Sequence, residues 1–293
     1  MKLKDEDLIA LADVACEAAR EAGALIASYR DRKVEVKHKA GGDSLASQVV
    51  TEVDGLAEGV ILRMLGPTLS RFDLALLTEE TADDGSRHRK DYFWCVDPLD
   101  GTLSFTQGIP GYSVSIALVR GDGVPMIGVV YDPVEAKLYR AVYGQGIAIN
   151  GIAWDRNGVD RTGNERLRLY CDCTFEKLPS RGEIVAEMEV LAERLDYAGL
   201  EVMIGGGAVL NACWVLEKGP SCYFKKPKIA MGGGSIWDFA ATACLFAEAK
   251  AYARDFTGEQ LELNRAESSF MNHRGVCYAT DEKLGEGLRG MAV

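Results

Sequence analysis

The sequence contains little of what several common classes of protein require. It has no apolar run of about 18 residues, so we expect no membrane span. Its first residues, Met1–Asp7, have no apolar core of the kind found in signal peptides. Its three histidines, His38, His88 and His273, have no ligand spacing to one another. A histidine-based zinc site and a phosphohistidine mechanism are therefore disfavoured.

The charge balance is acidic. Asp and Glu number 44 against 33 Lys and Arg, giving a formal net charge of −11. Because neutralisation of phosphates dominates the binding of nucleic-acid polymers, this charge argues against such a partner. It does not exclude a small phosphate ester, since bound cations set the local field of a site. Hydrophobic content of 47% in 293 residues predicts a folded chain with ample core, in one large or two smaller domains.

Cysteine and glycine patterns give no positive evidence for a redox or nucleotide site. The eight cysteines are few for this length and lie mostly in apolar runs, which predicts buried free thiols and a cytoplasmic location. Cys171-x-Cys173 alone is weak evidence for a metal site. The triple-glycine runs at 205–207 and 232–234 lack the nucleotide-loop pattern, so we interpret them as tight entries into helices.

The most informative segment is Asp97-Pro98-Leu99-Asp100-Gly101-Thr102, which follows the apolar predicted strand Tyr92–Val96. Pro98 has no N–H and is expected to end the hydrogen bonding of that strand. Gly101 allows a tight bend, and Thr102 is expected to cap a short helix. Carboxylates beside a helix N-terminus suit a divalent cation that carries a phosphate.

Three further segments place acidic residues at the ends of predicted elements. Glu79-Glu80 follows the apolar run 74–77, Asp238 begins the helical run 239–250, and Asp54 lies in the first turn of a helix that Thr51 can cap. Each has an ordinary explanation by itself, because acidic pairs at strand ends are commonly solvated and aspartates at helix starts commonly cap. These acidic residues are evidence for a metal site only because all of the segments occur in the same chain.

In order, the four segments resemble the inositol monophosphatase superfamily of metal-dependent, lithium-sensitive phosphatases. The pattern is Thr-x-x-Asp, Glu-Glu, Asp-Pro-Leu-Asp-Gly-Thr and Trp-Asp, and it extends from Thr51 to Asp238. The resemblance implies an α+β or α/β fold, the layered αβαβα sandwich of the inositol monophosphatase and fructose-1,6-bisphosphatase type. It also implies a phosphomonoesterase that uses two or three Mg²⁺ ions and is usually a homodimer.

The resemblance also implies a role for each matching residue. The first metal site would be Glu79, Asp97 and the carbonyl of Leu99; the second would be Asp97, Asp100 and Asp238. Asp54 and Thr102, with Glu79, would act in catalysis by orienting and deprotonating the attacking water. Phosphate and substrate would be bound by Gly101, Thr102, Gly206, Gly207 and Lys225.

Elementary chemistry supports these roles independently. A phosphate monoester dianion repels hydroxide, and two cations about 4 Å apart can hold both the attacking and the leaving oxygen. Mg²⁺ prefers carboxylates and water, which suits a site without histidine. Metal-bound water is the expected nucleophile, because no Ser or Cys is seen beside a histidine base.

Two alternatives belong to other classes. Haloacid-dehalogenase phosphatases use Asp-x-Asp-Gly-Thr near the start of the chain, with the first Asp as a covalent nucleophile. Here the spacing is Asp-x-x-Asp, a third of the way along the chain. The other alternative is an inactive scaffold that serves as a binding protein, which the presence of every matching acid disfavours.

The substrate is less well defined by the sequence. True inositol monophosphatases have a sugar-binding Glu seven residues before the Asp of Trp-Asp, where this chain has Met231. The basic cluster Lys225-Lys226-x-Lys228 could hold a second phosphate. We therefore predict a 3'(2'),5'-bisphosphate nucleotide or an inositol monophosphate as substrate, with a sugar phosphate or histidinol phosphate as the alternative. Glu248-Ala249-Lys250-Ala251 replaces the usual Glu-Ala-Gly-Gly, so the turn there is expected to differ.

The organisation of the chain predicts two domains. Residues 1–154 would form an N-terminal α+β domain with most of the metal ligands, and 155–293 a C-terminal α/β domain that supplies Asp238 and substrate contacts. The polar segment 155–164 is the predicted boundary. Predicted helices at 7–30 and 54–65 come first, the second stopped by Gly66-Pro67, and the loop at 41–44 is a candidate lid. Further predicted strands are 34–37, 112–120, 124–131, 137–142, 167–173, 201–204, 222–225, 251–255 and 275–280; further predicted helices are 183–195, 208–217 and 281–290.

Overall fold

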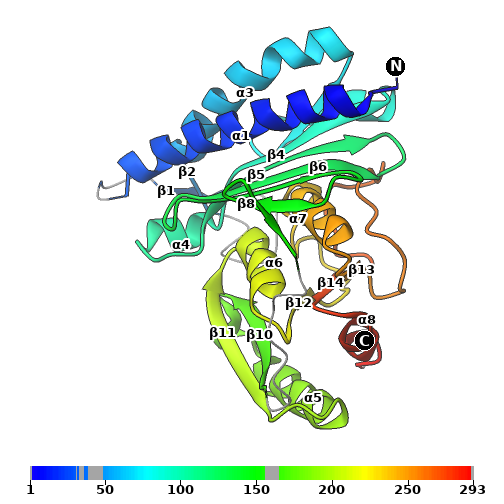
Figure 1. The fold of residues 1–293 in the computed structure, drawn as a ribbon. Helices are drawn as coiled ribbons and strands as arrows, with labels where there is room; N and C mark the ends of the chain where they lie inside the picture. Colours follow the sequence, from blue (N-terminus) through cyan, green and yellow to red (C-terminus); the bar gives the residue numbers. More distant parts are fainter. Residues whose placement is uncertain (1, 31, 33–35, 39–48, 156–164, 292–293) are drawn as a thin grey trace.

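The chain folds into five alternating layers of helices and sheets. The computed structural model describes residues 2–30, 32, 36–38, 49–155 and 165–291. One sheet has seven strands and the other has five. In Figure 1, helices cover the outer face of the first sheet, a central helical layer separates the two sheets, and an outer helical layer covers the far face of the second sheet. The predicted αβαβα sandwich is confirmed. The candidate lid at 41–44, most of the predicted boundary at 155–164, and the start of the predicted strand 34–37 lie outside the described residues.

The first layer consists of α1 (Asp5–Ser28) and α3 (Glu52–Phe72), which pack on each other and on the sheet. Apolar residues recur every three or four positions along α1, so one stripe of the helix is buried against its neighbours. Thr51 caps α3, and its backbone N–H donates to Asp54 in a capping box. The predicted cap of this helix is therefore confirmed.

The predicted end of α3 at Gly66-Pro67 is wrong. The helix continues through Pro67 and ends at Phe72, and its C-cap residue Asp73 has a left-handed backbone with φ of 53°. Pro67 is exposed, whereas Leu65, Thr68 and Phe72 on the inner face are buried. The Thr68 hydroxyl accepts a bond of 2.8 Å from the Trp94 indole N–H of the sheet. This packing of the inner face outweighs the local cost of proline.

The second layer is a seven-stranded sheet in the order β3-β4-β5-β6-β7-β8-β9, in which only the β3–β4 pair is parallel. Its strands are β3 (Ala75–Thr78), β4 (Tyr92–Asp100), β5 (Ser113–Arg120), β6 (Pro125–Asp132), β7 (Lys137–Val142), β8 (Ile147–Ile149) and β9 (Ile152–Trp154). The sequence predicted β3 to β7 but not the short strands β8 and β9. A separate ribbon pairs β1 (Val36–His38) with β2 (Val49–Thr51), and η1 (Ser86–His88) precedes β4.

Strand β4 does not stop at Pro98, as the sequence had suggested. It pairs with β5 at Asp97–Ser115 and again at Asp100–Ser113, with a register shift between the two pairs. A bulge accommodates a residue without an N–H, so the strand bends instead of ending. The bend lies between the two aspartates of the motif.

The central layer contains α6 (Ala208–Glu217) and α7 (Ile236–Glu248), and these two helices are almost entirely buried. Helix α7 packs very closely on β6, because a Cβ at Gly128 would lie 2.3 Å from the carbonyl oxygen of Ala241. Only glycine permits this approach. The strand therefore fixes the position of α7.

The fourth layer is a mixed sheet in the order β11-β10-β12-β14-β13, covered by the helices of the fifth layer. Its strands are β10 (Leu167–Asp172), β11 (Leu200–Gly206), β12 (Ser221–Lys225), β13 (Tyr252–Arg254) and β14 (Val276–Ala279). The outer helices are α5 (Arg181–Arg194) and α8 (Glu282–Arg289), and a single turn, η3 (Phe175–Lys177), follows β10. These strands and helices were predicted to within a few residues.

Two further expectations concern cysteine and membranes. All eight cysteines are free, and seven of them are buried, as predicted; Cys173 is half-buried. Within the described part of the chain, no helix is both long and apolar enough to cross a bilayer.

Replacing Pro67 tests the account of α3. We expect Pro67→Ala to raise the free energy of unfolding by about 1 to 3 kcal/mol, because it restores a helical N–H and removes the clash of the ring. Urea unfolding measures the change. A loss of stability would show that the helix needs the fixed φ of proline, and Gly66→Ala provides a neighbouring comparison.

Candidate active site

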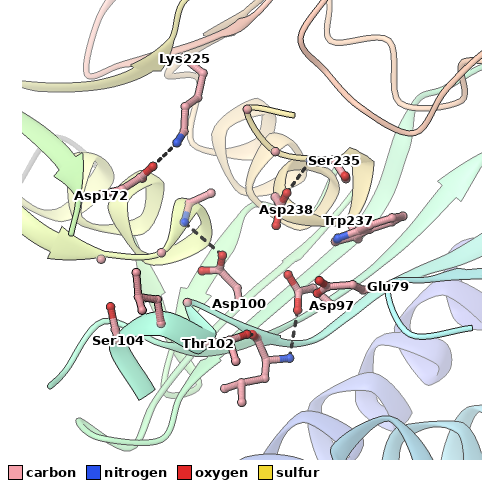
Figure 2. Close-up of a pocket in the computed structure, with 18 of the residues that line it drawn as sticks. Glu79, Asp97, Asp100, Thr102, Ser104, Asp172, Lys225, Ser235, Trp237 and Asp238 are labelled. Atoms are coloured by element: carbon pink, nitrogen blue, oxygen red, sulfur yellow. Dashed lines mark hydrogen bonds and ion pairs between the residues drawn. The ribbon is translucent and has the colours of Figure 1, made fainter. Parts of the chain in front are cut away.

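Acidic residues from three distant segments line one cavity of about 210 Å³. Asp97 and Asp100 lie on the bent end of β4, Glu79 directly follows β3, and Asp238 lies in the first turn of α7. Figure 2 shows these side chains directed toward a common space between the seven-stranded sheet and the central helices. The fold therefore brings together all four acidic side chains predicted to bind metal.

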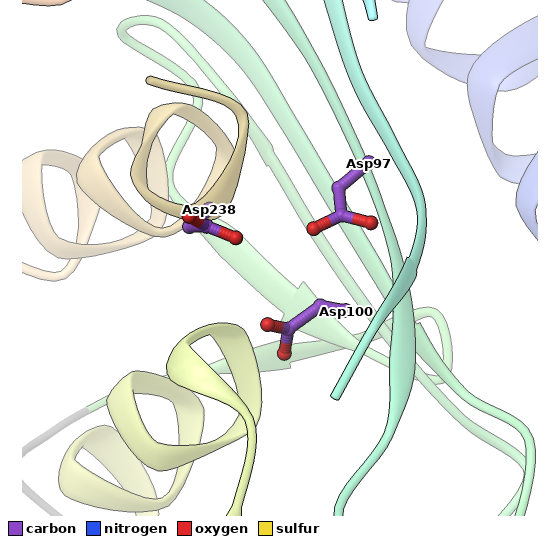
Figure 3. A group of neighbouring side chains, drawn as sticks. All are labelled: Asp97, Asp100 and Asp238. Atoms are coloured by element: carbon purple, nitrogen blue, oxygen red, sulfur yellow. The ribbon is translucent and has the colours of Figure 1, made fainter. Parts of the chain in front are cut away.

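Three of the carboxylates form a compact cluster. One oxygen from each of Asp97, Asp100 and Asp238 lies within 4.8 Å of the other two. Asp97 and Asp100 are buried and Asp238 is half-buried, and the three side chains point toward one another in Figure 3. Like charges this close repel strongly where little water can screen them.

Burial and this repulsion raise the pKa of the clustered acids. The pKa of Asp97 is raised well above its usual range by burial first and then by the charges of Glu79, Asp238 and Asp100. Burial and the charge of Asp238 also raise the pKa of Asp100 well above its usual range. Burial also raises the pKa of Asp238, and the hydrogen bond from the Ser235 N–H acts in the opposite direction.

Backbone N–H groups hold each carboxylate in place. Asp97 accepts a bond of 3.0 Å from the Leu99 N–H, within the bend. Asp100 accepts bonds of 3.1 and 3.0 Å from Ala208 and Val209, the first N–H groups of α6. Asp238 accepts from the Ser235 N–H in the capping box of α7. The carboxylates are thus oriented before any ligand binds.

The donor set fits a hard divalent cation. Every ligand that the cluster offers is a carboxylate oxygen, and Mg²⁺ prefers oxygen ligands and retains water. Glu79 lies beside the cluster, where the Glu79 N–H donates to the Val96 carbonyl at 3.2 Å and so fixes the backbone against β4. A cation here would remove the repulsion among the acids.

Thr102 does not cap α4 (Thr102–Thr106), contrary to the sequence prediction; Gly101 occupies the cap position. The Thr102 hydroxyl instead lies 3.0 Å from both Asp54 Oδ1 and the Leu99 carbonyl oxygen. The buried Asp54 carboxylate also accepts from the Thr51 N–H at 2.8 Å and from the Thr51 hydroxyl at 2.6 Å. Asp54 and Thr102, predicted as a catalytic pair, are therefore in direct contact at the edge of the cavity.

Two glycines make the close packing of this region possible. Gly101 has φ of 81°, and a Cβ there would lie 2.6 Å from the Gly111 carbonyl oxygen. A Cβ on Gly207 would lie 2.3 Å from Asp100 Oδ2. Gly207 therefore allows the start of α6 to approach Asp100. Gly206, also predicted to contact substrate, lines the same cavity.

The opposite wall of the cavity contains a pair that the sequence did not indicate. Lys225, at the end of β12, forms an ion pair with Asp172 at the end of β10. Asp172 also accepts bonds of 3.2 Å from the Asn211 amide and the Tyr223 hydroxyl. Burial opposes the charge on Lys225, but the Asp172 carboxylate outweighs this effect and raises the pKa of Lys225.

Sequence reasoning identified Lys225 but missed Asp172. Its position at the end of β10, similar to the position of Glu79 just after β3, was the available signal. Ser104, Cys173, Trp237 and Phe270 also line the cavity and were not predicted. Met231 is 61% exposed and is not among the lining residues. The position that holds a sugar-binding Glu in inositol monophosphatases is thus outside this cavity.

The fold and the acidic site are those of a phosphatase of the sandwich type, and comparison with known proteins agrees. The model of the inositol monophosphatase family matches residues 7–290. Nus factor SuhB of Pasteurella multocida is 32% identical over 249 residues, 84% of this chain and 85% of that protein. Inositol monophosphatase 2 of Solanum lycopersicum is 30% identical over 255 residues, 86% of this chain and 89% of that protein. The solved inositol monophosphatase from Anabaena has a TM-score of 0.71 at 23% identity and 97% coverage of both chains.

The chain belongs to the inositol monophosphatase family, whose members are phosphatases that hydrolyse phosphate monoesters. The resemblance inferred from the four acidic segments is therefore confirmed at the level of the family. The alternative assignment to the haloacid-dehalogenase phosphatases is excluded by the same match.

The crowded carboxylates predict an unusual dependence of stability on pH. A carboxyl whose pKa is raised by folding stabilises the fold below its ordinary pKa, about 3.9 for Asp. That stabilisation is lost as pH rises through the raised pKa of Asp97 and Asp100. Without divalent cations, we therefore expect the melting temperature to fall over this range, and Mg²⁺ to reduce the fall.

Asp97→Asn should raise the melting temperature of the cation-free protein at neutral pH and abolish its response to Mg²⁺. Asp122→Asn, which changes an exposed aspartate paired with Arg120, is the matched control and should leave the response intact. Thermal melts with and without Mg²⁺ measure both effects. Equal Mg²⁺ responses in the two variants would show that the cluster does not bind the ion.

Gly207→Ala tests the contact between α6 and Asp100. The added Cβ must displace the Asp100 carboxylate, and displacement of a reacting group by about 1 Å can reduce activity about 100-fold. Phosphatase turnover measures the effect. Gly182→Ala is the control, since a Cβ there would meet nothing within 4 Å. Unchanged turnover in Gly207→Ala would contradict the proposed importance of this approach.

Proposed function

We propose that this protein is a Mg²⁺-dependent phosphomonoesterase that hydrolyses a small phosphate ester by direct attack of water. The observation that carries the proposal is the convergence of Asp97, Asp100 and Asp238 next to the contact between Thr102 and Asp54. A buried acidic cluster supplies cation ligands, and the adjacent pair supplies a route for a proton. Among the residues that the structure describes, no histidine lines this cavity, which fits water and not a histidine-activated side chain as the nucleophile.

The proposed ligands divide into two sets that share Asp97. Glu79, Asp97 and the carbonyl of Leu99 form one set; Asp97, Asp100 and Asp238 form the other. Mg²⁺ bound by these oxygens would neutralise the charge of the phosphate and polarise its oxygens. The N–H groups that hold the carboxylates keep the two sets oriented without substrate.

Thr102 and Asp54 would orient the attacking water. The Thr102 hydroxyl donates to Asp54 Oδ1 or to the Leu99 carbonyl, so its oxygen remains able to accept a proton from water. As the water oxygen attacks phosphorus, its proton passes to Thr102 Oγ1 and the threonine proton passes to Asp54. The bond between phosphorus and the ester oxygen breaks, and the released alcohol takes a proton from solvent.

The turn at Gly101 and Thr102 would hold the phosphate. Its N–H groups and those that follow begin α4, and N–H groups in the first turn of a helix have no acceptor inside the helix. They are therefore available to phosphate oxygens. Gly101 is required because its φ of 81° and its contact with Gly111 exclude a side chain.

The alcohol would face Asp172 and Lys225, with Gly206 and Gly207 beside it. This carboxylate and ammonium offer both an acceptor and donors to the hydroxyls of a sugar or cyclitol. A 3'(2'),5'-bisphosphate nucleotide and an inositol monophosphate are the proposed substrates, with a sugar phosphate or histidinol phosphate as the alternative. Lys225 and Lys226 pair with Asp172 and Glu187, so a second phosphate would have to displace these carboxylates.

The family also supports three broader proposals for this chain. We expect a homodimer, inhibition by Li⁺, and two or three cations in each site. We also propose the division into residues 1–154 and 155–293, with Asp238 and the pair of Asp172 and Lys225 coming from the second part.

A panel of phosphate esters assayed with and without Mg²⁺ tests the function. We expect phosphate release that requires the cation and that falls by orders of magnitude in Asp238→Asn, since Asn still accepts the capping bond but loses the charge. Circular dichroism should show that this variant remains folded. Absence of phosphate release from every ester would favour the binding-scaffold alternative, and near-normal rates in both Asp97→Asn and Asp238→Asn would show that the metal site is wrongly assigned.

A further inference from the structure

The position of Glu79 depends on the irregular segment that follows β3. Glu79 is the first residue after this strand, and its side chain lies beside Asp97 in Figure 2. Its backbone N–H donates to the Val96 carbonyl oxygen at 3.2 Å, which fixes the residue on the side of β4. Residues 79–84 form neither helix nor strand, so contacts with other elements must set the course of the chain there.

One such contact comes from Glu58, a buried residue of α3. Its Oε1 accepts a hydrogen bond of 2.5 Å from the Thr78 hydroxyl, and its Oε2 accepts one of 3.2 Å from the Thr81 hydroxyl. Thr78 directly precedes Glu79, and Thr81 follows it two positions later. A single carboxylate therefore holds the bend that carries Glu79 from both of its flanks.

The chemistry of these contacts favours a role in orientation over a role in stability. Glu58 is 8% exposed and Thr78 is 3% exposed, so the carboxylate and its shorter hydrogen bond are removed from water. Burial of a carboxylate is costly, and an apolar side chain can often fill such a position with little loss of stability. Hydrogen bonds from a hydroxyl to a carboxylate are short and directional, so they fix the backbone more closely than apolar packing would.

Glu58 reaches the cavity through these threonines and not directly. It is not among the residues that line the cavity, whereas Glu79 is. It lies four residues after Asp54, which places the two side chains on the same side of α3. Because Asp54 contacts Thr102, one side of this helix touches both the proposed proton acceptor's partner and the bend that carries a proposed cation ligand.

We propose that Glu58 is a positioning residue for Glu79, which it holds in place to bind a divalent cation. This inference rests on the proposed function, in which Glu79, Asp97 and the carbonyl of Leu99 form one set of cation ligands. Groups that orient a metal ligand commonly contribute about 10- to 100-fold to metal affinity. Loss of the Glu58 carboxylate therefore weakens the binding of Mg²⁺ before any substrate is present.

Calorimetric titration of the substrate-free protein with Mg²⁺ tests the proposal. Glu58→Met keeps an unbranched side chain but removes both acceptors, and we expect it to raise the dissociation constant at least about tenfold. Glu58→Gln can accept from one hydroxyl and donate to the other, so we expect a rise of less than about threefold. Glu17→Gln, which changes an exposed carboxylate of α1, is the matched control and should bind Mg²⁺ normally.

A double-mutant cycle with Glu79→Gln separates positioning from a general loss of structure. If Glu58 acts through Glu79, Glu58→Met should raise the dissociation constant less than about twofold in a protein that already carries Glu79→Gln. Fully additive effects would overturn the proposal, and so would an unchanged dissociation constant in folded Glu58→Met. Thr81→Val removes one hydroxyl at an exposed position and provides the same cycle if Glu58→Met does not fold.

The panel of phosphate esters distinguishes this proposal from the proposed function. If no ester is hydrolysed but the cycle is non-additive, the proposed function fails and the positioning role stands. If phosphate is released but Mg²⁺ binding does not depend on Glu58, the positioning role fails and the function stands. If the unmodified protein does not bind Mg²⁺, both are wrong.

Discussion

The mutual repulsion of buried carboxylates is the constraint around which this molecule is arranged. Asp97, Asp100 and Asp238 are held together although burial and their neighbours oppose their ionisation. Side chains in such a position would turn away from one another unless the surrounding structure fixed them. The bend in β4, the start of α6 and the capping box of α7 each fix one of them.

The layered fold supplies these fixed positions. The central helices lie between two sheets, and the first turns of both helices face the bend at the end of β4. Free N–H groups at helix starts stabilise negative charge, so the same geometry that orients Asp100 also offsets part of its repulsion. Packing, which is not specific to any reaction, thereby produces a buried cluster of carboxylate oxygens, the ligand type that divalent cations prefer.

Much of the fold and of the acidic site could be predicted from the sequence. Apolar runs in the sequence mark where strands and helices end, so acidic residues next to those ends could be recognised. The structure brings four of them to one cavity: Glu79, Asp97, Asp100 and Asp238. The expectation that proline ends a helix or a strand failed twice. Tertiary packing carries α3 through Pro67, and a bulge carries β4 through Pro98.

The substrate side was less predictable for a physical reason. Asp172 and Lys225 are separated by more than fifty positions and meet only because β10 and β12 are neighbours in the sheet. A basic cluster marks Lys225 and a strand end marks Asp172, but neither feature of the sequence indicates that the two residues form a pair. The assignment of Thr102 as a cap was reasonable by its position, but its hydroxyl contacts Asp54, on a different element of the fold.

The close packing of α7 on β6 makes the position of Asp238 depend on Gly128, a residue more than a hundred positions earlier in the chain. Gly128 touches the second turn of the helix whose first turn carries Asp238. Any side chain at that strand position would push the helix outward and move its carboxylate relative to the two aspartates of β4. Position 128 must therefore remain glycine if Asp238 is to keep its place beside Asp97 and Asp100, although Gly128 itself is not part of the cavity.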